Sequence, residues 1–453
     1  MPEPGSSRGP RGAAATPVVV VRGGTVVDAG GERRADVVVR GGTVVAVAPD
    51  AEVPRGATVL DAGGCWVSPG LVDLHAHLRQ PGAEDAETVH SGARAAALGG
   101  YTAVLAMPNT DPPVDSAAVA LEVLALGAAA PCAVHVAGAI TVGRAGAQLA
   151  PMGELAALGV RLFTDDGAGV QDAAVMRRAL EYARGLGVTL AQHCEDEALA
   201  GGGAMHEGEW SSRLGVPGIP PEAEELMVAR DIALARLTKG RVHFLHLSTA
   251  RSAALVAEAK REGLAVTAEV APHHLSLTHA ELAGYDPLFK VNPPLRTDAD
   301  VAALRAACAS GTVDAVATDH APHPPERKDV PLDSAPAGML GLQTALPVVL
   351  GALADGHGTP AMSARDVLAL LSWQPARIAG LTPAQGGDQG GPLGEGAAAN
   401  ICVIDPARTW EVDPARLASP SRNTPWAGRV LTGQVRHTLL RGEPVVVDGE
   451  AQR

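Results

Sequence analysis

Polar side chains, most of which can bind a metal ion or transfer a proton, recur at the carboxyl ends of apolar runs in this 453-residue chain. They are Asp73, His75, His77, Arg79, Asn109, Asp165, Asp166, His193, Glu195, His246, His273, His274, Asp319, His320 and His323. In a barrel of parallel strands these positions meet at one mouth, where the active sites of that fold lie. We therefore expect one site that these side chains share.

The pair His75 and His77 can reach one ion, because residues i and i+2 of a strand point to the same face. Fifteen histidines in 453 residues make a chance pair of this spacing common, so the pair alone is a weak signal. Its place before Leu-Arg-x-Pro-Gly, at the end of a buried first strand, favours a functional role.

The candidate ligands comprise four histidines and two carboxylates, without a thiolate. They are His75, His77, His193, His246, Asp166 and Asp319. Nitrogen and oxygen ligands of this kind suit catalytic zinc, which manganese or cobalt could replace. Six protein ligands are too many for one tetrahedral ion that must keep a water. We therefore expect two ions that share a bridging carboxylate and a bridging hydroxide.

Eight apolar runs predict the strands that position these residues. The runs are GLVDLHAHLR, YTAVLAMPNT, CAVHVAGAIT, VRLFTDDG, VTLAQHCED, VHFLHLST, AVTAEVAPHH and DAVATDHAPH. Continuous apolar character indicates burial on both faces, as in a parallel sheet covered by helices. Amphipathic stretches such as Glu84–Gly99 and Glu222–Leu237 supply those helices.

The alternation of strand and helix predicts an α/β fold, with a (β/α)8 TIM-type barrel over residues 68–389. A doubly wound open sheet is the alternative. No G-x-G-x-x-G loop follows the first strand, which weakens that alternative.

Short β-branched runs broken by glycine pairs flank the barrel region at both ends. They predict one small composite β-sandwich domain built from residues 17–67 and 390–449, since two separate sheets of about fifty residues would be marginal alone. Residues 1–16 are rich in turn-forming and polar types, so we expect a disordered tail there.

Composition excludes several classes of function. Thirty-six basic and 50 acidic residues give a net charge of −14, which argues against a nucleic-acid surface. The five cysteines lie far apart and indicate neither a thiolate zinc site nor a disulfide framework. No apolar signal segment or membrane-spanning run is present in the sequence, so we expect a cytoplasmic protein that binds no membrane.

A set of motifs in chain order resembles the bacterial class I dihydroorotases of the cyclic amidohydrolase superfamily. The motifs are DLHAHLRQPG (73–82), MPNT (107–110), FTDDGAGVQ (163–171), HCED (193–196), HLST (246–249), EVAPHHL (269–275), KVNPPLR (290–296) and ATDHAPH (317–323). The resemblance implies a hydrolase that reversibly converts N-carbamoyl-L-aspartate to L-dihydroorotate and water in pyrimidine biosynthesis.

The resemblance also implies which residues hold the two zinc ions. His75, His77 and Asp319 would bind one ion, His193 and His246 the other, and Asp166 would bridge them. Strand alternation allows only one of Asp165 and Asp166 to face the ions. Relatives that hydrolyse hydantoins or allantoin bridge their metals with a carboxylated lysine. The four lysines here, Lys239, Lys260, Lys290 and Lys328, all follow His193, which favours dihydroorotase.

Catalytic and substrate-binding roles follow from the same resemblance. Asp319 would accept the proton of the attacking hydroxide and deliver it to the departing ring nitrogen. His77, Arg79, Asn109, Asn292, His323, Ala337 and Gly338 would contact the substrate. Arg79 offers a bidentate fork for a carboxylate, and the Ala337–Gly338 backbone would meet the ring amide. Many relatives carry Phe at the position of Ala337, so packing above the substrate differs here.

Two alternatives remain at this point. One is another cyclic amidohydrolase, of the hydantoinase or allantoinase kind. The other is a catalytically silent relative that serves as a scaffold for aspartate carbamoyltransferase, although such chains lack several of the metal ligands that this one has. The partners that we expect are the small-molecule substrate, a second copy in a homodimer, and aspartate carbamoyltransferase.

Overall fold

The computed structural model describes residues 17–354 and 361–453, so the predicted tail over 1–16 lies outside the described residues. Each of the eight apolar runs contains a parallel strand. The strands are β8 (Leu71–Ala76), β9 (Tyr101–Ala106), β10 (Ala133–Val136), β11 (Leu162–Phe163), β12 (Thr189–Gln192), β15 (Val242–Phe244), β16 (Val266–Val270) and β17 (Ala315–Val316). The predicted α/β class is thereby confirmed.

The eight strands form two hydrogen-bonded sheets, ordered β10-β9-β8 and β11-β12-β15-β16-β17. Isolated parallel bridges join these sheets at both edges, one between Gly138 and Phe163 and one between Ala76 and His320. Since all the pairings are parallel, the carboxyl ends of the strands lie on the same side. The loops that follow them carry the candidate ligands.

Apolar side chains fill the space between the strands. The cluster there contains Leu74, Leu105, Met107, Ala137, Leu162, Ala191, Leu245, Ala315, Ala317 and Ala379. Neighbours such as Phe163, Leu190 and Phe244 belong instead to the main core, which includes the buried faces of the helices. This division follows from the alternation of side chains along a strand and buries each strand on both faces.

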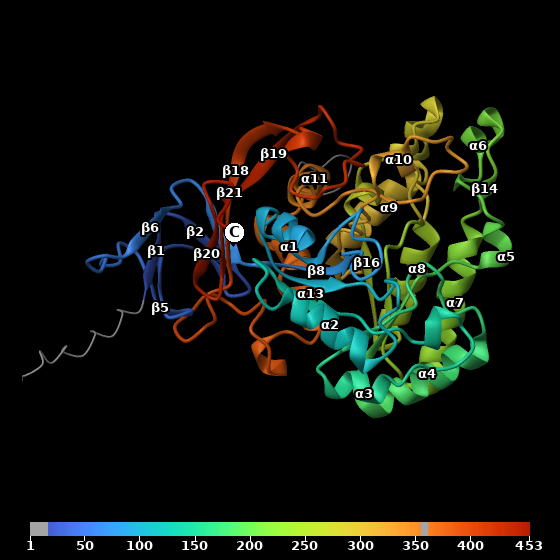
Figure 1. Cartoon of the computed structure of the whole chain (residues 1–453), viewed down its shortest axis with the longest axis horizontal. Coiled ribbons are helices and arrows are strands. Elements are labelled where there is room, and N and C mark those ends of the chain that lie inside the picture. Colours follow the sequence, from blue (N-terminus) through green and yellow to red (C-terminus); the bar gives the residue numbers. More distant parts are fainter. Residues whose placement is uncertain (1–16, 355–360) are drawn as a thin grey trace, which may run out of the picture.

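Helices cover the outer side of the strands (Figure 1). Outside the insertion over 197–219, the helices of six or more residues are α1 (Val89–Leu98), α2 (Ala117–Gly127), α3 (Met152–Ala157), α4 (Ala173–Leu186), α7 (Glu222–Thr238), α8 (Ala250–Arg261), α9 (Asp298–Ala309), α11 (Ala345–Leu353), α12 (Ala364–Leu371) and α13 (Trp373–Ile378). Helix α7 spans the predicted stretch. Helix α1 starts at Val89 rather than Glu84, because Thr88 and Ser91 form a capping box that fixes its first turn.

Shorter elements lie in the connections between the strands and helices. They are α5 (Glu197–Ala200), β13 (Met205–His206), α6 (Glu209–Leu214), β14 (Gly218–Ile219), α10 (Pro325–Lys328) and the 3-10 helices η1 (Val142–Arg144), η2 (Pro272–Leu275), η3 (His279–Gly284), η4 (Pro287–Phe289), η5 (Pro383–Gln385) and η6 (Pro414–Arg416). The insertion over 197–219 was not predicted from the sequence, since each of its elements is only two to six residues long.

Two further sheets are built from the flanking regions. One has the order β5-β4-β1-β6 and the other β21-β20-β19-β18-β7-β2-β3. Their strands are β1 (Val18–Arg22), β2 (Thr25–Asp28), β3 (Gly31–Arg34), β4 (Asp36–Arg40), β5 (Thr43–Ala48), β6 (Thr58–Asp61), β7 (Trp66–Pro69), β18 (Ile401–Glu411), β19 (Val430–Leu440), β20 (Glu443–Val447) and β21 (Glu450–Ala451). Strands from both ends of the chain lie side by side, blue beside red in Figure 1.

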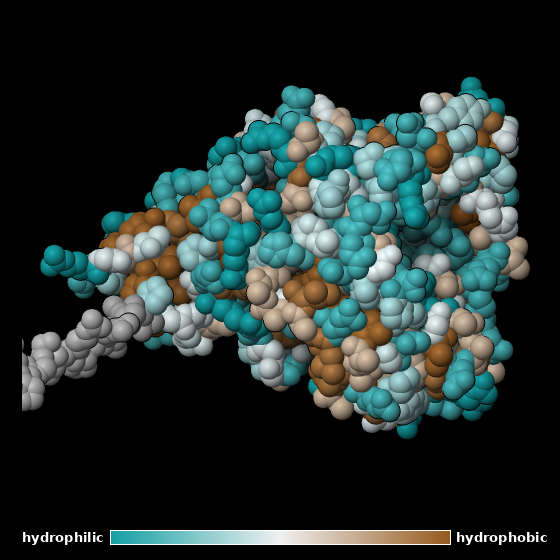
Figure 2. Space-filling model, viewed as in Figure 1, coloured by the Kyte–Doolittle hydropathy of each residue, from teal (hydrophilic) through white to brown (hydrophobic). Residues whose placement is uncertain are grey.

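A separate apolar cluster lies between these two sheets. Val19, Val37 and Leu60 from the first sheet share it with Ile401 and Leu439 from the second. Figure 2 shows apolar residues on the surface over β1 and β6, where Val59 is 47% exposed. No helix in the described ranges is long and apolar enough to cross a membrane.

Candidate metal centre and substrate pocket

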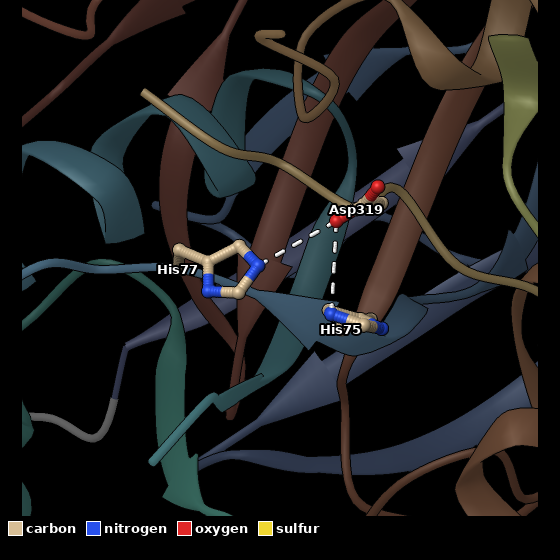
Figure 3. Close-up of side chains that lie close together, drawn as sticks. All are labelled: His75, His77 and Asp319. Carbon is tan, nitrogen blue, oxygen red and sulfur yellow. Dashed lines mark ion pairs between the residues drawn. The ribbon is translucent and has the colours of Figure 1, made fainter. Parts of the chain in front are cut away.

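The carboxyl end of β8 and the loop after β17 bring His75, His77 and Asp319 together. The Nε2 atom of His75 lies 3.6 Å from Asp319 Oδ1, and that of His77 lies 3.5 Å from the same oxygen. Figure 3 shows both imidazoles turned toward this carboxylate. All three residues are buried. Two imidazole nitrogens and one carboxylate oxygen therefore face a common point.

Asp166 extends this group toward two further histidines. Its Oδ2 atom lies 3.3 Å from His75 Nε2 and 3.5 Å from His77 Nε2. Its Oδ1 atom lies 3.5 Å from His193 Nδ1 and 3.5 Å from His246 Nε2. The two oxygens of one carboxylate thus face two different pairs of imidazoles, which is the geometry that a bridging ligand needs.

Six buried donors in this arrangement fit divalent cations. His75, His77 and Asp319 form one group of atoms spaced as metal ligands, and His75, Asp166 and His246 form another. Among the described residues, His75 Nε2 and Asp166 Oδ1 are buried without a hydrogen-bond partner. Buried polar atoms rarely stay unpaired in proteins, and nitrogen and oxygen donors suit zinc. The residues therefore can hold a metal.

The electrostatics keep both carboxylates of the centre ionised. Burial by itself would raise the pKa of Asp166, but the facing imidazoles, His75 foremost, hold it well below its usual range. The pKa of Asp319 is likewise lowered against the effect of burial, by a hydrogen bond with His77 and the charge of His75. Ionised carboxylates and neutral imidazoles are the forms that bind cations.

A layer of hydrogen bonds behind the centre fixes the orientation of its histidines. Nδ1 of His75 lies 3.0 Å from Glu269 Oε1, and Oε2 of Glu269 lies 3.0 Å from Nε2 of His243. Nδ1 of His77 lies 2.8 Å from Asn109 Oδ1. Such outer partners set the tautomer of a ligating imidazole and point its other nitrogen at the metal.

Asp165 points away from the centre. Its Oδ1 accepts hydrogen bonds from the backbone amides of Ile140 and Thr141, at 2.8 and 3.0 Å, and the Thr141 hydroxyl bonds to its other oxygen. Asp73 is also buried, and it accepts bonds from the amide and hydroxyl of Thr318. Both carboxylates join neighbouring strand ends rather than face the imidazoles.

A pocket of about 220 Å³ opens beside both aspartates of the centre and three of its four histidines, His77, His193 and His246. Every residue predicted to contact the substrate lines it, namely His77, Arg79, Asn109, Asn292, His323, Ala337 and Gly338. The Nε atom of Arg79 donates to Pro322 O at 3.1 Å and its Nη2 lies 3.5 Å from His323 Nε2, so Nη1 is the nitrogen that has no partner among the described residues. Asn292 Oδ1 has no hydrogen-bond partner among the described residues, so the pocket offers unpaired polar groups.

The loops around the pocket hold their functional residues in strained backbone conformations. Arg79, His246 and Asp319 have φ angles of 61°, 29° and 47°. Non-glycine residues rarely adopt positive φ, and where they do the strain often marks a functional site. Gly338, with φ 132°, has no room for a side chain, because an added Cβ would lie 2.6 Å from Ala321 Cβ and 3.0 Å from His323 Nε2.

Several residues that support the site were not singled out from the sequence. Glu269 begins the EVAPHH motif. It could have been found because it is the carboxylate nearest in sequence to His273 and His274. Asn423 gave no such signal, because it lies in an irregular segment 100 residues beyond His323. Its side chain accepts from His323 N and donates to Ala321 O and Gly338 O.

Comparisons with known proteins identify relatives of this chain. A family model described as Dihydro-orotase-like matches residues 64–252. A dihydroorotase of Anaeromyxobacter dehalogenans is 52% identical over 441 residues, which cover 96% of this chain and 99% of that protein. A dihydroorotase of Mycobacterium tuberculosis is 48% identical over 436 residues, covering 95% and 99%.

Solved structures of cyclic amidohydrolases share the fold. L-Hydantoinase from Arthrobacter aurescens superposes with a TM-score of 0.83 at 24% identity, covering 96% of this chain and 97% of that one. D-Hydantoinase from a Bacillus species superposes with a TM-score of 0.82 at 25% identity, covering 96% of each chain.

Proposed function

This chain belongs to the dihydroorotase family, and from that membership we propose that it interconverts N-carbamoyl-L-aspartate and L-dihydroorotate at the pocket beside Asp166. The chain is a hydrolase of cyclic amide bonds. The observation that carries the proposal is the pair of Asp166 oxygens, each facing a different pair of imidazoles. We propose that His75, His77 and Asp319 hold one zinc ion, His193 and His246 hold a second, and Asp166 bridges the two.

Bound divalent ions would polarise the ring carbonyl and make water a nucleophile at neutral pH. The protein supplies the proton transfer. Oδ1 of Asp319 faces His75 and His77, while its Oδ2 lies toward His273 Nε2 at 3.8 Å. During ring opening Asp319 takes a proton from the attacking water and gives it to the departing ring nitrogen. In cyclisation the same proton moves in the opposite direction.

The pocket supplies binding for a substrate with acidic groups. Arg79 carries the positive charge nearest to the proposed substrate, and Asn109 and Asn292 add amide groups. His323 is neutral, because burial and the charge of Arg79 lower its pKa to about 3. A neutral His323 donates or accepts hydrogen bonds without adding charge. Since the whole chain carries a net charge of −14, the local field at the pocket must attract the substrate.

Substrate assays test this proposal against the hydantoinase alternative. We expect purified zinc-loaded protein to turn over dihydroorotate and carbamoyl aspartate, and to leave hydantoin, dihydrouracil and allantoin unchanged. Preferential turnover of hydantoin or allantoin would replace the proposal. Absence of all turnover by protein that retains zinc would favour the scaffold function instead.

The remaining architectural proposals rest on the sheets described above. We propose that the eight parallel strands close into a barrel over residues 68–389, supported by the bridges at both sheet edges. Residues 17–67 and 390–449 would form the small sandwich domain, supported by the apolar cluster between its sheets. We also propose that the protein is cytoplasmic, that it forms a homodimer and that it associates with aspartate carbamoyltransferase.

A further inference from the structure

A second cavity, of about 480 Å³, lies at the amino ends of the parallel strands, opposite the proposed active site. The starts of β11, β12, β15 and β16 contribute to it, together with helix α13 and the segment that follows. Its polar lining consists of Arg161, Arg241, Arg377, Thr189, Thr267 and Gln385. Its volume falls in the range of about 300–1,000 Å³ that small-molecule sites occupy.

The charge of this cavity is unusual for the molecule. Three arginines line it, whereas no acidic residue occurs among the described residues of its wall. None of Arg161, Arg241 and Arg377 forms an ion pair within the described ranges of the chain. Three like charges around one cavity repel each other, and the chain as a whole carries a charge of −14. All three arginines are exposed, so the cluster is open to a negatively charged ligand from solution.

Two of these guanidiniums are already oriented by the backbone. Nη1 of Arg161 donates to Ala156 O at 2.8 Å and to Val160 O at 3.1 Å. Nη2 of Arg241 donates to Gly187 O. Each keeps further N–H groups for a ligand, and Arg377 has no side-chain partner in the described structure. A guanidinium that is held in place loses less conformational entropy when it binds.

We propose that this cavity is a binding site for an anion that carries a chain of phosphate groups. Arginine binds phosphate oxygens through paired N–H groups, and three guanidiniums call for a ligand with several charges within one cavity. Val242, Val266 and Ile378 provide an apolar wall, which would accept an organic group attached to the phosphates. The shared chemistry is the phosphate chain, either free or as part of a nucleoside triphosphate.

A chain of hydrogen bonds connects this cavity to the proposed metal centre. The Oγ1 atom of Thr267, in the cavity wall, lies 2.8 Å from His243 Nδ1. His243 Nε2 lies 3.0 Å from Glu269 Oε2, and Glu269 Oε1 lies 3.0 Å from His75 Nδ1. The hydrogen bonds thus run from the half-buried Thr267 through the buried side chains of His243 and Glu269 to His75.

The connection gives the site a way to act on the enzyme. The two oxygens of Glu269 each face one imidazole, Oε1 toward His75 and Oε2 toward His243, so this carboxylate can accept a hydrogen bond from both. When Nε2 of His243 donates to Glu269, its Nδ1 accepts the single hydroxyl proton of Thr267. If the Thr267 hydroxyl donates its hydrogen bond to a phosphate oxygen instead, His243 loses that partner and the support of His75 is loosened. We expect bound phosphate to lower turnover.

Binding of tripolyphosphate and of ATP to the metal-loaded protein tests the site. We expect isothermal titration to detect both ligands at concentrations below ~1 mM. The triple variant Arg161→Gln, Arg241→Gln, Arg377→Gln should weaken both at least tenfold. The exposed Arg178 lies outside the cavity, so Arg178→Gln is the matched control and should bind as wild type does. If the triple variant unfolds, Arg377→Gln alone serves, because its side chain has no partner to lose.

Comparison of the two ligands identifies the source of the phosphate. Equal affinities would indicate that the phosphate chain is sufficient, and tighter binding of ATP would indicate that the apolar wall holds the nucleoside. Absence of binding of both ligands to wild type, or equal binding by wild type and the triple variant, overturns the proposal. Both ligands also chelate metals. The site is therefore judged by the difference in ligand affinity between wild type and the triple variant.

Thr267→Val tests the connection to His75. The change keeps the shape of the side chain and removes the hydroxyl. We expect the Kd for tripolyphosphate to stay within about threefold of the wild-type value. The effect of tripolyphosphate on the turnover of dihydroorotate should disappear. An effect equal to that on wild type would refute the coupling. The binding measurements need no turnover, so they stand even if the proposed dihydroorotase activity fails.

Discussion

The carboxylate of Asp319 faces both His75 and His77, and it also lines the proposed substrate pocket. The same residue can therefore bind a metal ion and transfer a proton to or from the substrate. Asp319→Asn keeps the size of the side chain but cannot accept and return a proton. We expect kcat to fall about 10²–10⁴-fold in both directions, the range associated with general acid–base catalysis, with a smaller change in KM. Steady-state kinetics and zinc analysis of the same sample measure both effects. Near-normal kcat at full zinc content would contradict the proton-transfer role.

Glu269 acts on the centre only through His75 and is therefore a positioning residue. Glu269→Gln removes the buried negative charge behind the imidazole, and we expect zinc affinity to fall about 10–100-fold, as is common for such outer partners. Competition with a chelator measures the affinity. Glu269→Asp retains the charge and should recover part of it. Equal zinc affinity in all three proteins would show that Glu269 does not support His75.

At the scale of elements, the loop over 324–338 depends on a buried lysine. Lys328 is 3% exposed, and its Nζ donates to Pro336 O at 2.8 Å, Pro287 O at 3.0 Å and Lys290 O at 3.4 Å. The loop ends at Ala337 and Gly338 in the pocket wall. Lys328→Met removes this donor from all three carbonyls. Pro287 O and Lys290 O still accept from backbone amides, whereas Pro336 O keeps no other donor among the described residues, at about 1–3 kcal/mol for a buried group left unpaired.

We therefore expect Lys328→Met to raise the KM for dihydroorotate about 5–20-fold, corresponding to about 1–2 kcal/mol, with a smaller loss of kcat. The exposed Lys239 provides the control in Lys239→Met, whose kinetics should match wild type. An unchanged KM in the Lys328 variant would mean that the loop holds its position without the lysine.

The same lysine makes stability depend on pH. Burial and the charge of Lys290 lower the pKa of Lys328 to about 7, from 10.5. Between these values the unfolded chain binds more protons at this residue than the native state, so native stability rises with pH. Relative to Lys328→Met, wild type should gain melting temperature as the pH increases from 7 to 9. A constant difference between the two proteins would contradict a lowered pKa.

Sequence patterns were most informative for elements with a strong local signal. Continuous apolar runs predicted all eight parallel strands, because burial on both faces leaves few polar residues in them. The start of α1 was misplaced by five residues, since Thr88 and Ser91 form a cap that acidic Glu84 to Glu87 obscured. Contacts such as those of Asn423 with Gly338 depend on how distant segments pack, and local patterns carry no information about that.

At the scale of the whole molecule, the two chain ends meet in one sheet. Strand β18 pairs with β7 over Ile401 to Ile404 and with β19 on its other side. The C-terminal region also reaches the larger part of the molecule, because Val412 and Trp426 pack with Leu277, Val291 and Met339. Asn423, which supports the pocket, lies in this segment. The flanking regions therefore contribute to the site as well as to the small sheets.

Metal binding should stabilise the whole fold, because the proposed centre joins the ends of β8, β11, β12, β15 and β17 through buried side chains. A ligand at 100 times its Kd adds about 2.7 kcal/mol to native stability. Removal of zinc leaves the Asp166 and Asp319 carboxylates buried without a cation, which costs further free energy. We expect chelation to lower the apparent melting temperature by at least about 5 °C, given about 2–4 °C per kcal/mol for large domains. Scanning calorimetry of chelated and zinc-restored protein at one scan rate measures this shift. If zinc leaves the protein and the melting temperature stays constant, the six ligands do not share the ions that connect these strands.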